Sequence, residues 1–225
     1  MASQQRLLHD ISHELRSPLA RLKIALELAR QSDGQEALWA LDRIEREADR
    51  LNDLIGQLLT LARLENDQPQ TGKEFVDLRE LVDEIVFDAD FEAGNYNRAV
   101  KVITSQDCMI EGDEQLLRSA IENVVRNAVS YTAEGTTVEL SLRRQDDDGG
   151  GRVVISVLDK GAGVPQAALA EIFRPFYRVE DARDRQSGGI GLGLSISRRA
   201  VQAHGGTVTA SNAPSGGLLV VISFQ

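Results

Sequence analysis

The sequence is poor in cysteine, in long apolar runs and in basic residues, and each shortage excludes a class of protein. The single cysteine, Cys108, excludes an internal disulfide framework and is typical of a reducing compartment. No uninterrupted apolar run approaches the roughly 20 residues that a membrane-spanning helix needs, and no signal-peptide pattern opens the chain. The formal net charge of -10 argues against a nucleic-acid partner, because phosphate binding favours clustered lysine and arginine.

What is present is the composition of a soluble globular chain with two modules. Hydrophobic residues make up 42% of the 225 residues and charged residues 27%, which suits one ordinary domain plus a smaller one. Helical periodicity fills residues 7–65, a polar stretch typical of a linker occupies 66–73, and strands alternate with helices beyond it. We therefore expect a helical module over residues 1–68 and a second module over 69–225. Because the first motif opens close to the N-terminus, we also expect the chain to be a piece of a longer protein.

The first module carries apolar residues at the alternating spacings of four and three that mark a heptad seam. On the second helix the seam residues share one stripe, and they are Ala37, Leu41, Ile44, Ala48, Leu51, Ile55, Leu58 and Ala62. The turn residues Ser32-Asp33-Gly34 separate this helix from a first helix of the same spacing, which predicts an antiparallel hairpin. A lone hairpin cannot enclose so broad a stripe, so we expect a symmetric dimer that forms a four-helix bundle. Packing of the hairpin against its own chain is the alternative.

The first helix carries a histidine in the run His13-Glu14-Leu15-Arg16-Ser17-Pro18-Leu19. Helix geometry turns His13 roughly 200° away from Ile11 on the apolar stripe, so the imidazole is expected to be exposed. Glu14 can hold one ring nitrogen or accept its proton, which leaves the other nitrogen free to attack phosphorus. Pro18 predicts a local bend about one turn further on. An ordinary surface histidine beside a glutamate is the alternative interpretation.

The second module has the pattern of seven strands and four helices. The strands are expected at Glu74–Leu78, Val100–Ser105, Cys108–Glu111, Thr136–Arg144, Val153–Asp159, Thr207–Ala210 and Leu218–Phe224. The helices are expected at Arg79–Ala93, Glu114–Ser130, Pro165–Ile172 and Leu192–His204, the second of them capped by Asp113. Residues 145–151, rich in Asp and Gly, are interpreted as a solvated turn. His9 and His204 have no motif around them and are interpreted as structural.

Two clusters of the second module suit a nucleotide and its metal ion. In Glu122-Asn123-Val124-Val125-Arg126-Asn127-Ala128 two asparagines lie four apart, so their amides project from one helical face while the two valines pack inward. Neutral amide oxygens suit Mg²⁺ whose charge is already matched by phosphates. In Asp159-Lys160-Gly161-Ala162-Gly163 the aspartate ends a strand and can accept a hydrogen bond from an amino group. The two glycines let a flat base approach the backbone.

Two further clusters follow along the chain. Phe173-Arg174-Pro175-Phe176-Tyr177-Arg178 places aromatic anchors beside cations. Gly188-Gly189-Ile190-Gly191-Leu192-Gly193-Leu194 opens a helix, whose N-terminal amides can bind phosphate. A dinucleotide-binding fingerprint is excluded because a polar loop precedes this run instead of a strand. A Walker-type loop is excluded because no Gly-Lys-Ser/Thr follows.

In this order, the five clusters resemble the H, N, G1, F and G2 boxes of bacterial sensor histidine kinases, and the run from Phe173 to Gly189 is similar to the Cpx-type envelope-stress subfamily. The resemblance implies an α+β chain: an antiparallel helical hairpin that dimerises into a four-helix bundle, then an α/β sandwich ATP-binding domain of the histidine kinase/gyrase type. It implies ATP-dependent autophosphorylation of His13 and phosphotransfer to an aspartate of a response regulator. Phosphatase activity toward that regulator is a further expectation.

The resemblance also implies a role for each matching residue. His13 would be the phosphoacceptor, Glu14 its hydrogen-bonding partner, and Ser17 would place a water for dephosphorylation. Arg178 begins the ATP lid, residues 178–187, whose cations would steady the γ-phosphate. Mg²⁺ would bind Asn127, and ATP would contact Asn123, Asn127, Tyr131, Asp159, Gly161, Gly163, Gly189, Gly191, Leu192 and Gly193. The expected partners are a second copy of the chain and a receiver domain. The chain would be a cytoplasmic fragment of an inner-membrane protein.

Three residues depart from the family pattern. Ser17 stands where many members have threonine, and it keeps the hydroxyl but lacks the methyl group that restricts the rotamers of threonine, which bears on phosphatase strength. Ser130 stands where a cation often lies near the phosphates. Lys160 stands where an acidic or small residue is common.

Two other functions are compatible with an ATP site. A gyrase-type ATPase needs a glutamate one turn before the Mg²⁺-binding asparagine to activate water. Here that position is Asn123, and Glu122 is rotated by about 100°, so the base is missing. A non-catalytic dimeric ATP-binding scaffold, or pseudokinase, is opposed by the intact His13, Asn127, Asp159 and lid glycines.

Overall fold

The computed structural model describes residues 2–65, 74–147, 150–179 and 190–225. The chain divides into two compact units, Met1–Ala62 and Arg63–Gln225. The expected linker over residues 66–73 lies outside the described residues. Within the described ranges, no helix is both long enough and apolar enough to cross a lipid bilayer.

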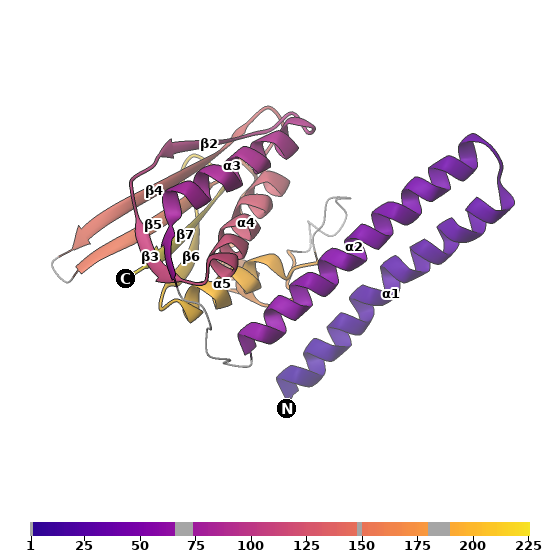
Figure 1. Cartoon of the computed structure of the whole chain (residues 1–225), viewed down its shortest axis with the longest axis horizontal. Coiled ribbons are helices and arrows are strands. Elements are labelled where there is room, and N and C mark those ends of the chain that lie inside the picture. Colours follow the sequence, from indigo (N-terminus) through magenta and orange to yellow (C-terminus); the bar gives the residue numbers. More distant parts are fainter. Residues whose placement is uncertain (1, 66–73, 148–149, 180–189) are drawn as a thin grey trace. The chain divides into compact units, whose positions relative to one another are not determined.

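The first unit is an antiparallel pair of helices, α1 (Ala2–Gln31) and α2 (Gln35–Glu65), which confirms the predicted hairpin (Figure 1). Gly34 forms the turn with a φ of 62°, a left-handed conformation that glycine adopts without a steric penalty. Pro18 lies inside α1, and the helix continues on both sides of it.

The buried positions of α2 follow a heptad spacing, but they are offset from the predicted seam. Ala40, Leu54 and Leu61 are at most 2% exposed and recur at multiples of seven. Of the predicted seam, Leu41 and Ile55 are 52% and 47% exposed. The difference arises because the buried side of α2 is the one that carries Ala40, Leu54 and Leu61, so part of the predicted seam stays open to solvent.

Glu47 occupies the remaining position of this buried stripe and pairs with Arg21 of α1. Nε and Nη2 of Arg21 donate to the two carboxylate oxygens, at 2.7 and 2.9 Å. The hydrogen bond from Arg21 holds the pKa of Glu47 below its ordinary value, against the opposing effect of burial. An ion pair therefore joins the two helices where an apolar contact would otherwise lie.

The second unit contains a five-stranded sheet in the order β2-β4-β5-β7-β6 and a separate antiparallel pair, β1-β3. In the large sheet β2 runs parallel to β4, and the other neighbours are antiparallel. These positions agree closely with the predicted strands except at one hairpin. Residues 145–151 were predicted to be a turn, but β4 continues to Asp147 and β5 begins at Gly150, because their backbones remain paired up to Asp147 and Gly150. The bounds are β1 Glu74–Asp77, β2 Ala99–Thr104, β3 Met109–Gly112, β4 Thr137–Asp147, β5 Gly150–Leu158, β6 Thr207–Asn212 and β7 Leu218–Phe224.

Three helices cover one face of the large sheet, which makes a two-layer sandwich (Figure 1). They are α3 (Leu78–Gly94), α4 (Glu114–Tyr131) and α5 (Gly193–Ala203). Alternate residues of β7 are buried, as expected for a strand with one face on the core. The predicted α+β order, a hairpin followed by an α/β sandwich, is confirmed.

One predicted helix is wrong. Residues 165–172 form no single α-helix but two 3₁₀ helices, Gln166–Ala168 and Glu171–Phe173. The hydrogen bonds from Ala168 N to Pro165 O and from Arg174 N to Glu171 O span three residues, the pattern of the tighter 3₁₀ turn. This path lets Ala168, Ile172 and Phe173 all be buried.

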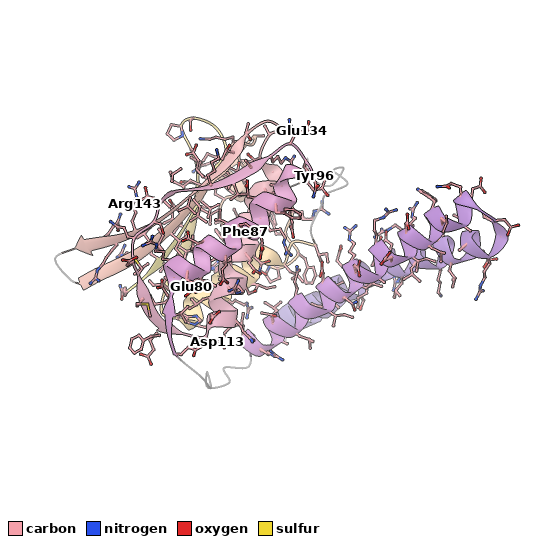
Figure 2. All side chains as sticks on the ribbon, turned by 45° about the horizontal axis from the view of Figure 1, so that its top comes forward. Glu80, Phe87, Tyr96, Asp113, Glu134 and Arg143 are labelled. Carbon is pink, nitrogen blue, oxygen red and sulfur yellow. The ribbon has the colours of Figure 1, made fainter. Side chains whose placement is uncertain are left out.

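His204 joins the end of α5 to the start of α4. Its Nδ1 lies 2.7 Å from the carbonyl of Ala200, and its Nε2 accepts a hydrogen bond from the backbone N–H of Asp113 at 2.9 Å. Asp113, labelled in Figure 2, caps α4 by accepting from Leu116 N. The predicted N-cap and the structural role of His204 are both confirmed. The side chain of His9 lies outside the described residues.

Gly112→Ala is expected to destabilise the second unit by about 1–3 kcal/mol, a typical cost of overpacking. A Cβ at Gly112 would lie 2.6 Å from the His204 ring and 2.9 Å from Leu117, so the link between α4 and α5 must shift. Gly94→Ala is the matched control, since its Cβ meets nothing within 4 Å. Urea denaturation of both variants measures the difference, and equal stabilities would contradict the role of His204.

Candidate functional site

Three of the residues expected to bind the nucleotide form one stripe on α4. Asn123, Asn127 and Tyr131 recur every four residues and are half-buried, whereas Val124 and Val125 are each 1% exposed. The predicted orientation, valines inward and amides together, is confirmed. The stripe extends about 12 Å along the helix axis, a length comparable with an extended nucleoside triphosphate.

The N-terminus of α5 lies against the Asn123 end of this stripe. A Cβ at Gly193, the first residue of α5, would be 3.1 Å from Oδ1 of Asn123. Ser197 fixes the contact by donating a hydrogen bond to the carbonyl of Ala120 at 2.8 Å. Leu192 precedes the helix and is fully buried. The free amides at the start of α5 therefore lie beside the amide side chain of Asn123.

Asp159 lies at the C-terminal end of β5 and is only 2% exposed. Its Oδ1 accepts hydrogen bonds from the backbone N–H groups of Gly161 at 2.7 Å and Leu218 at 3.2 Å. Burial raises the pKa of this carboxyl group, and the two hydrogen bonds oppose that rise. Among the described residues all hydrogen bonds to Asp159 reach Oδ1, so Oδ2 can accept one from a ligand.

Glycine is required around Asp159 by close backbone approaches. A Cβ at Gly161 would collide with the carbonyl oxygen of Tyr131, and one at Gly217 would collide with that of Asp159. Gly163 has a φ of 73°, and a Cβ there would lie 2.7 Å from Oδ1 of Asn212. The loop after β5 is therefore packed against the C-terminal end of α4, so Gly161 lies at the Tyr131 end of the stripe.

Three residues that contact this loop from other parts of the chain were not predicted from the sequence. Thr132 accepts a hydrogen bond from Lys160 N at 3.0 Å, and Asn212 bonds both backbone groups of Val164 at 2.7 and 2.8 Å. Gly217 is the third. The Gly-Gly pair before β7 is a signal that could have indicated Gly217, whereas the contacts of Asn212 depend on a distant strand and leave no local pattern. The side chain of Lys160 forms an ion pair with Glu139 at 2.9 Å.

Phe176 and Gly191 meet at the two ends of the expected lid. The N–H of Phe176 donates to the carbonyl of Gly191 at 2.9 Å, and Phe176 has a φ of 61°, a strained value for a bulky residue. Gly191 has a φ of 82°. Arg178 is half-buried. Lid residues 180–187 and Gly189 lie outside the described residues.

In the helical unit, His13 lies within α1, and its side chain is outside the described residues. Glu14 and Ser17 are exposed. The hydroxyl of Ser17 accepts a hydrogen bond from Arg21 at 2.6 Å.

The described residues contain no cluster of three or more His, Cys, Asp or Glu that could hold a metal ion. A metal site here would need oxygen donors of another kind, such as asparagine amides and phosphates.

Two family models match the chain. One, described as the His Kinase A (phospho-acceptor) domain, matches residues 3–67. The other, described as the histidine kinase-, DNA gyrase B-, and HSP90-like ATPase, matches residues 112–225, which is half of the chain. The chain belongs to the sensor histidine kinases. The phospho-acceptor domain ahead of the ATP-binding domain separates this kinase from the gyrase-type ATPases.

Relatives of known sequence agree with the family models. The kinase is 42% identical over 223 residues to the sensor histidine kinase CpxA of Escherichia coli, covering 99% of this chain and 47% of CpxA. It is 31% identical over 225 residues to the sensor-like histidine kinase SenX3 of Mycolicibacterium smegmatis, covering 99% and 58%. The chain thus spans about half the length of the curated relatives it matches. The predicted resemblance, including its Cpx-type subfamily, is confirmed.

Solved structures share the fold. The histidine kinase AdeS of Acinetobacter baumannii superposes with a TM-score of 0.71 at 19% identity, covering 95% of this chain and 97% of AdeS. Full-length ShkA, solved in complex with AMPPNP, gives a TM-score of 0.70 at 29% identity, covering 97% and 45%. These matches confirm the fold, the family models place the chain among the histidine kinases, and none of them supports a non-catalytic scaffold.

Asp159→Asn is expected to change how stability depends on pH. Because burial raises the pKa of Asp159, the native state holds more protons than the unfolded state between the unfolded and folded pKa. Stability from this group is full below the unfolded pKa of about 3.9 and is lost as the pH rises through the folded pKa. Asparagine cannot ionise, so the variant should gain stability over wild type toward neutral pH. Urea denaturation at several pH values measures this, and parallel profiles would refute it.

Proposed function

We propose that this kinase binds ATP along the α4 stripe, transfers its γ-phosphoryl group to His13 and then passes it to an aspartate of a response regulator. The observation that supports this most is the arrangement at the two ends of the stripe. One end has a buried carboxylate whose Oδ2 accepts no hydrogen bond from the described residues, and the other has a helix N-terminus beside Asn123. A nucleotide base suits the carboxylate end and a polyphosphate suits the helix N-terminus, and the length of the α4 stripe separates them as a nucleoside triphosphate requires.

At the Asp159 end, Oδ2 would accept a hydrogen bond from the amino group of adenine. Gly161 and Gly163 would keep the loop in place beside the base, because a side chain at either position would collide with Tyr131 or Asn212 and displace the loop. The buried surroundings strengthen this hydrogen bond, since water does not compete for the carboxylate. Tyr131 contributes its backbone at the junction with the loop.

At the other end, the α5 amides and the amides of Asn123 and Asn127 would hold the phosphates. Bound Mg²⁺ would neutralise phosphate charge, with Asn127 as its protein ligand and phosphates and water as the others. The half-buried amide oxygens fit such an ion, which takes few protein ligands. Arg178 and the lid glycines, including Gly189, Gly191 and Gly193, would place further donors around a charge-spread transition state.

The transfer itself would use His13 and Glu14. One ring nitrogen attacks the γ-phosphorus, the bond from that phosphorus to the bridging oxygen breaks, and ADP leaves. Glu14 holds the proton of the other ring nitrogen and offsets the positive charge that develops on the ring. Ser17 would orient a water for the reverse function, removal of phosphate from the regulator.

The partners follow from the open apolar surface of the hairpin. Large apolar residues remain exposed there, including Leu19, Ile24, Leu28, Leu38, Trp39, Leu41, Ile55 and Leu59. A second copy of the chain would cover them in a four-helix bundle. In the full protein, this chain would be the cytoplasmic part of an inner-membrane sensor, and the receiver domain of a response regulator would be the second partner.

His13→Ala is expected to abolish labelling when the chain is incubated with Mg²⁺ and γ-labelled ATP, because the nucleophile is removed. His9→Ala, on the same helix, is the matched control and should keep the wild-type label. The label should be stable to base and labile to acid, as a phosphorus–nitrogen bond requires. Equal labelling of His13→Ala and wild type would overturn the assignment.

Asp159→Asn should also alter nucleotide choice. The amide replaces an acceptor by a donor, so ATP binding should weaken by about 1–3 kcal/mol, the cost of an unmatched buried polar contact. GTP, whose ring carbonyl can accept from the amide, should lose less or gain. Calorimetric titration with both nucleotides measures this, and unchanged ATP affinity would place the adenine elsewhere.

A further inference from the structure

Ser17 has a fixed partner in the helical hairpin. It follows His13 by four residues on α1, and its Oγ accepts a hydrogen bond from Nη1 of Arg21 at 2.6 Å. Arg21 follows by four residues more, so the three positions share one stripe of the helix. Ser17 is exposed, so its hydroxyl is accessible to water and to a docked partner.

Arg21 is itself fixed by Glu47 on the neighbouring helix, α2. Its Nε and Nη2 bond the two carboxylate oxygens at 2.7 and 2.9 Å, a bidentate geometry that sets the plane of the guanidinium. The Glu47 side chain is 12% exposed and that of Arg21 32%. With two nitrogens engaged and the plane set, the third nitrogen points in one direction, toward Ser17.

This contact bears on the rotamer of Ser17. Serine populates three staggered χ1 rotamers, whereas the methyl group of threonine restricts that choice. A charge-assisted hydrogen bond from Arg21 favours the one rotamer in which Oγ meets Nη1. The same bond occupies a lone pair of Oγ, so the hydroxyl proton is directed elsewhere, and the nearby cation makes that proton a stronger donor.

We propose that Arg21, held by Glu47, is a positioning residue for Ser17 in dephosphorylation of the response regulator. It supplies by hydrogen bonding the rotameric order that threonine obtains from its methyl group. The inference rests on the proposed function. In that reaction a water oxygen forms a bond to the phosphorus of the phospho-aspartate while the bond to the carboxylate oxygen breaks. Inorganic phosphate leaves with the water-derived proton, and Ser17 orients the attacking water.

The test combines one change at the ion pair with three residues at position 17. The pair variant Arg21→Met/Glu47→Met removes both charges together, so neither is left partly buried without a partner and the hairpin should stay folded. It is made in the wild-type, Ser17→Ala and Ser17→Thr backgrounds. Arg21→Lys is a second variant, which keeps the charge opposite Glu47 but not the planar fork that reaches Ser17. Circular dichroism verifies the helical content of each.

Two rates are measured for each variant of this chain. The first is autophosphorylation with γ-labelled ATP. The second is loss of label from a receiver domain phosphorylated with labelled acetyl phosphate. The receiver domain is chosen from a panel of receiver domains of the source organism, as the one to which the wild-type chain transfers phosphate fastest. Glu27→Met/Gln31→Met is the matched control, because it removes an exposed hydrogen bond of 2.8 Å elsewhere on α1.

The pair variant should lower dephosphorylation about tenfold, the worth of one positioned hydrogen bond, and change autophosphorylation less than about twofold. Arg21→Lys should lower dephosphorylation to a similar extent. In the Ser17→Thr background, the pair variant should lower the dephosphorylation rate less than about threefold. In the Ser17→Ala background it should not lower that rate at all, because Arg21 acts through the serine hydroxyl. The matched control should leave both rates unchanged.

An equal loss in all three backgrounds would overturn the proposal, since Arg21 would then act on phosphate or on folding independently of Ser17. A wild type that labels His13 but never dephosphorylates its receiver would overturn it as well. Absence of label on wild-type His13 would overturn the proposed function, and the inference with it, so the two failures are distinguishable.

Discussion

The carboxylate of Asp159 is enclosed by backbone at the end of β5, and the ATP-binding unit is arranged around that enclosure. Its Oδ1 draws in the N–H groups of Gly161 and Leu218, which lie on the following loop and on β7. The backbone can pack so closely here only because Gly161, on the following loop, and Gly217, just before β7, carry no side chain. Burial of a carboxylate costs free energy, and a fold that retains one there has kept a feature typical of binding sites.

The second constraint is the packing of α4, which gives the stripe its direction. Val124 and Val125 bury one side of the helix, so Asn123 and Asn127 must lie toward the other. Ser197 and His204 join α5 to α4 at two points, one near the middle of α5 and one at its C-terminal end. The separation between the helix N-terminus and the Asp159 loop is therefore set by core packing. A ligand of matching length would therefore contact both ends without any movement of α4.

Most of the fold could be predicted because its signals are local. Alternation identified β7, and the spacing of four placed Asn123 and Asn127 on one face. Periodicity over eight residues cannot distinguish a 3₁₀ path from an α-helix, which is why 165–172 was wrong. Asn212 and the Arg21–Glu47 pair were not foreseen, because their partners lie far away in sequence and depend on strand order and helix rotation. The heptad spacing of α2 was predicted correctly, but the predicted seam is offset from the buried stripe, because which residues are buried depends on the side of α2 that its neighbour covers.

The ion pair within the hairpin also has a consequence for alignment. Leucine and alanine contacts between two helices are interchangeable, since an apolar side chain packs nearly as well one turn further along. A bidentate bond between Arg21 and Glu47 is not interchangeable. Sliding α1 along α2 by one turn, about 5.4 Å, would break it and leave two shielded charges unpaired. The pair thus selects one register, and it assigns each residue of the His13 stripe a definite neighbour on α2.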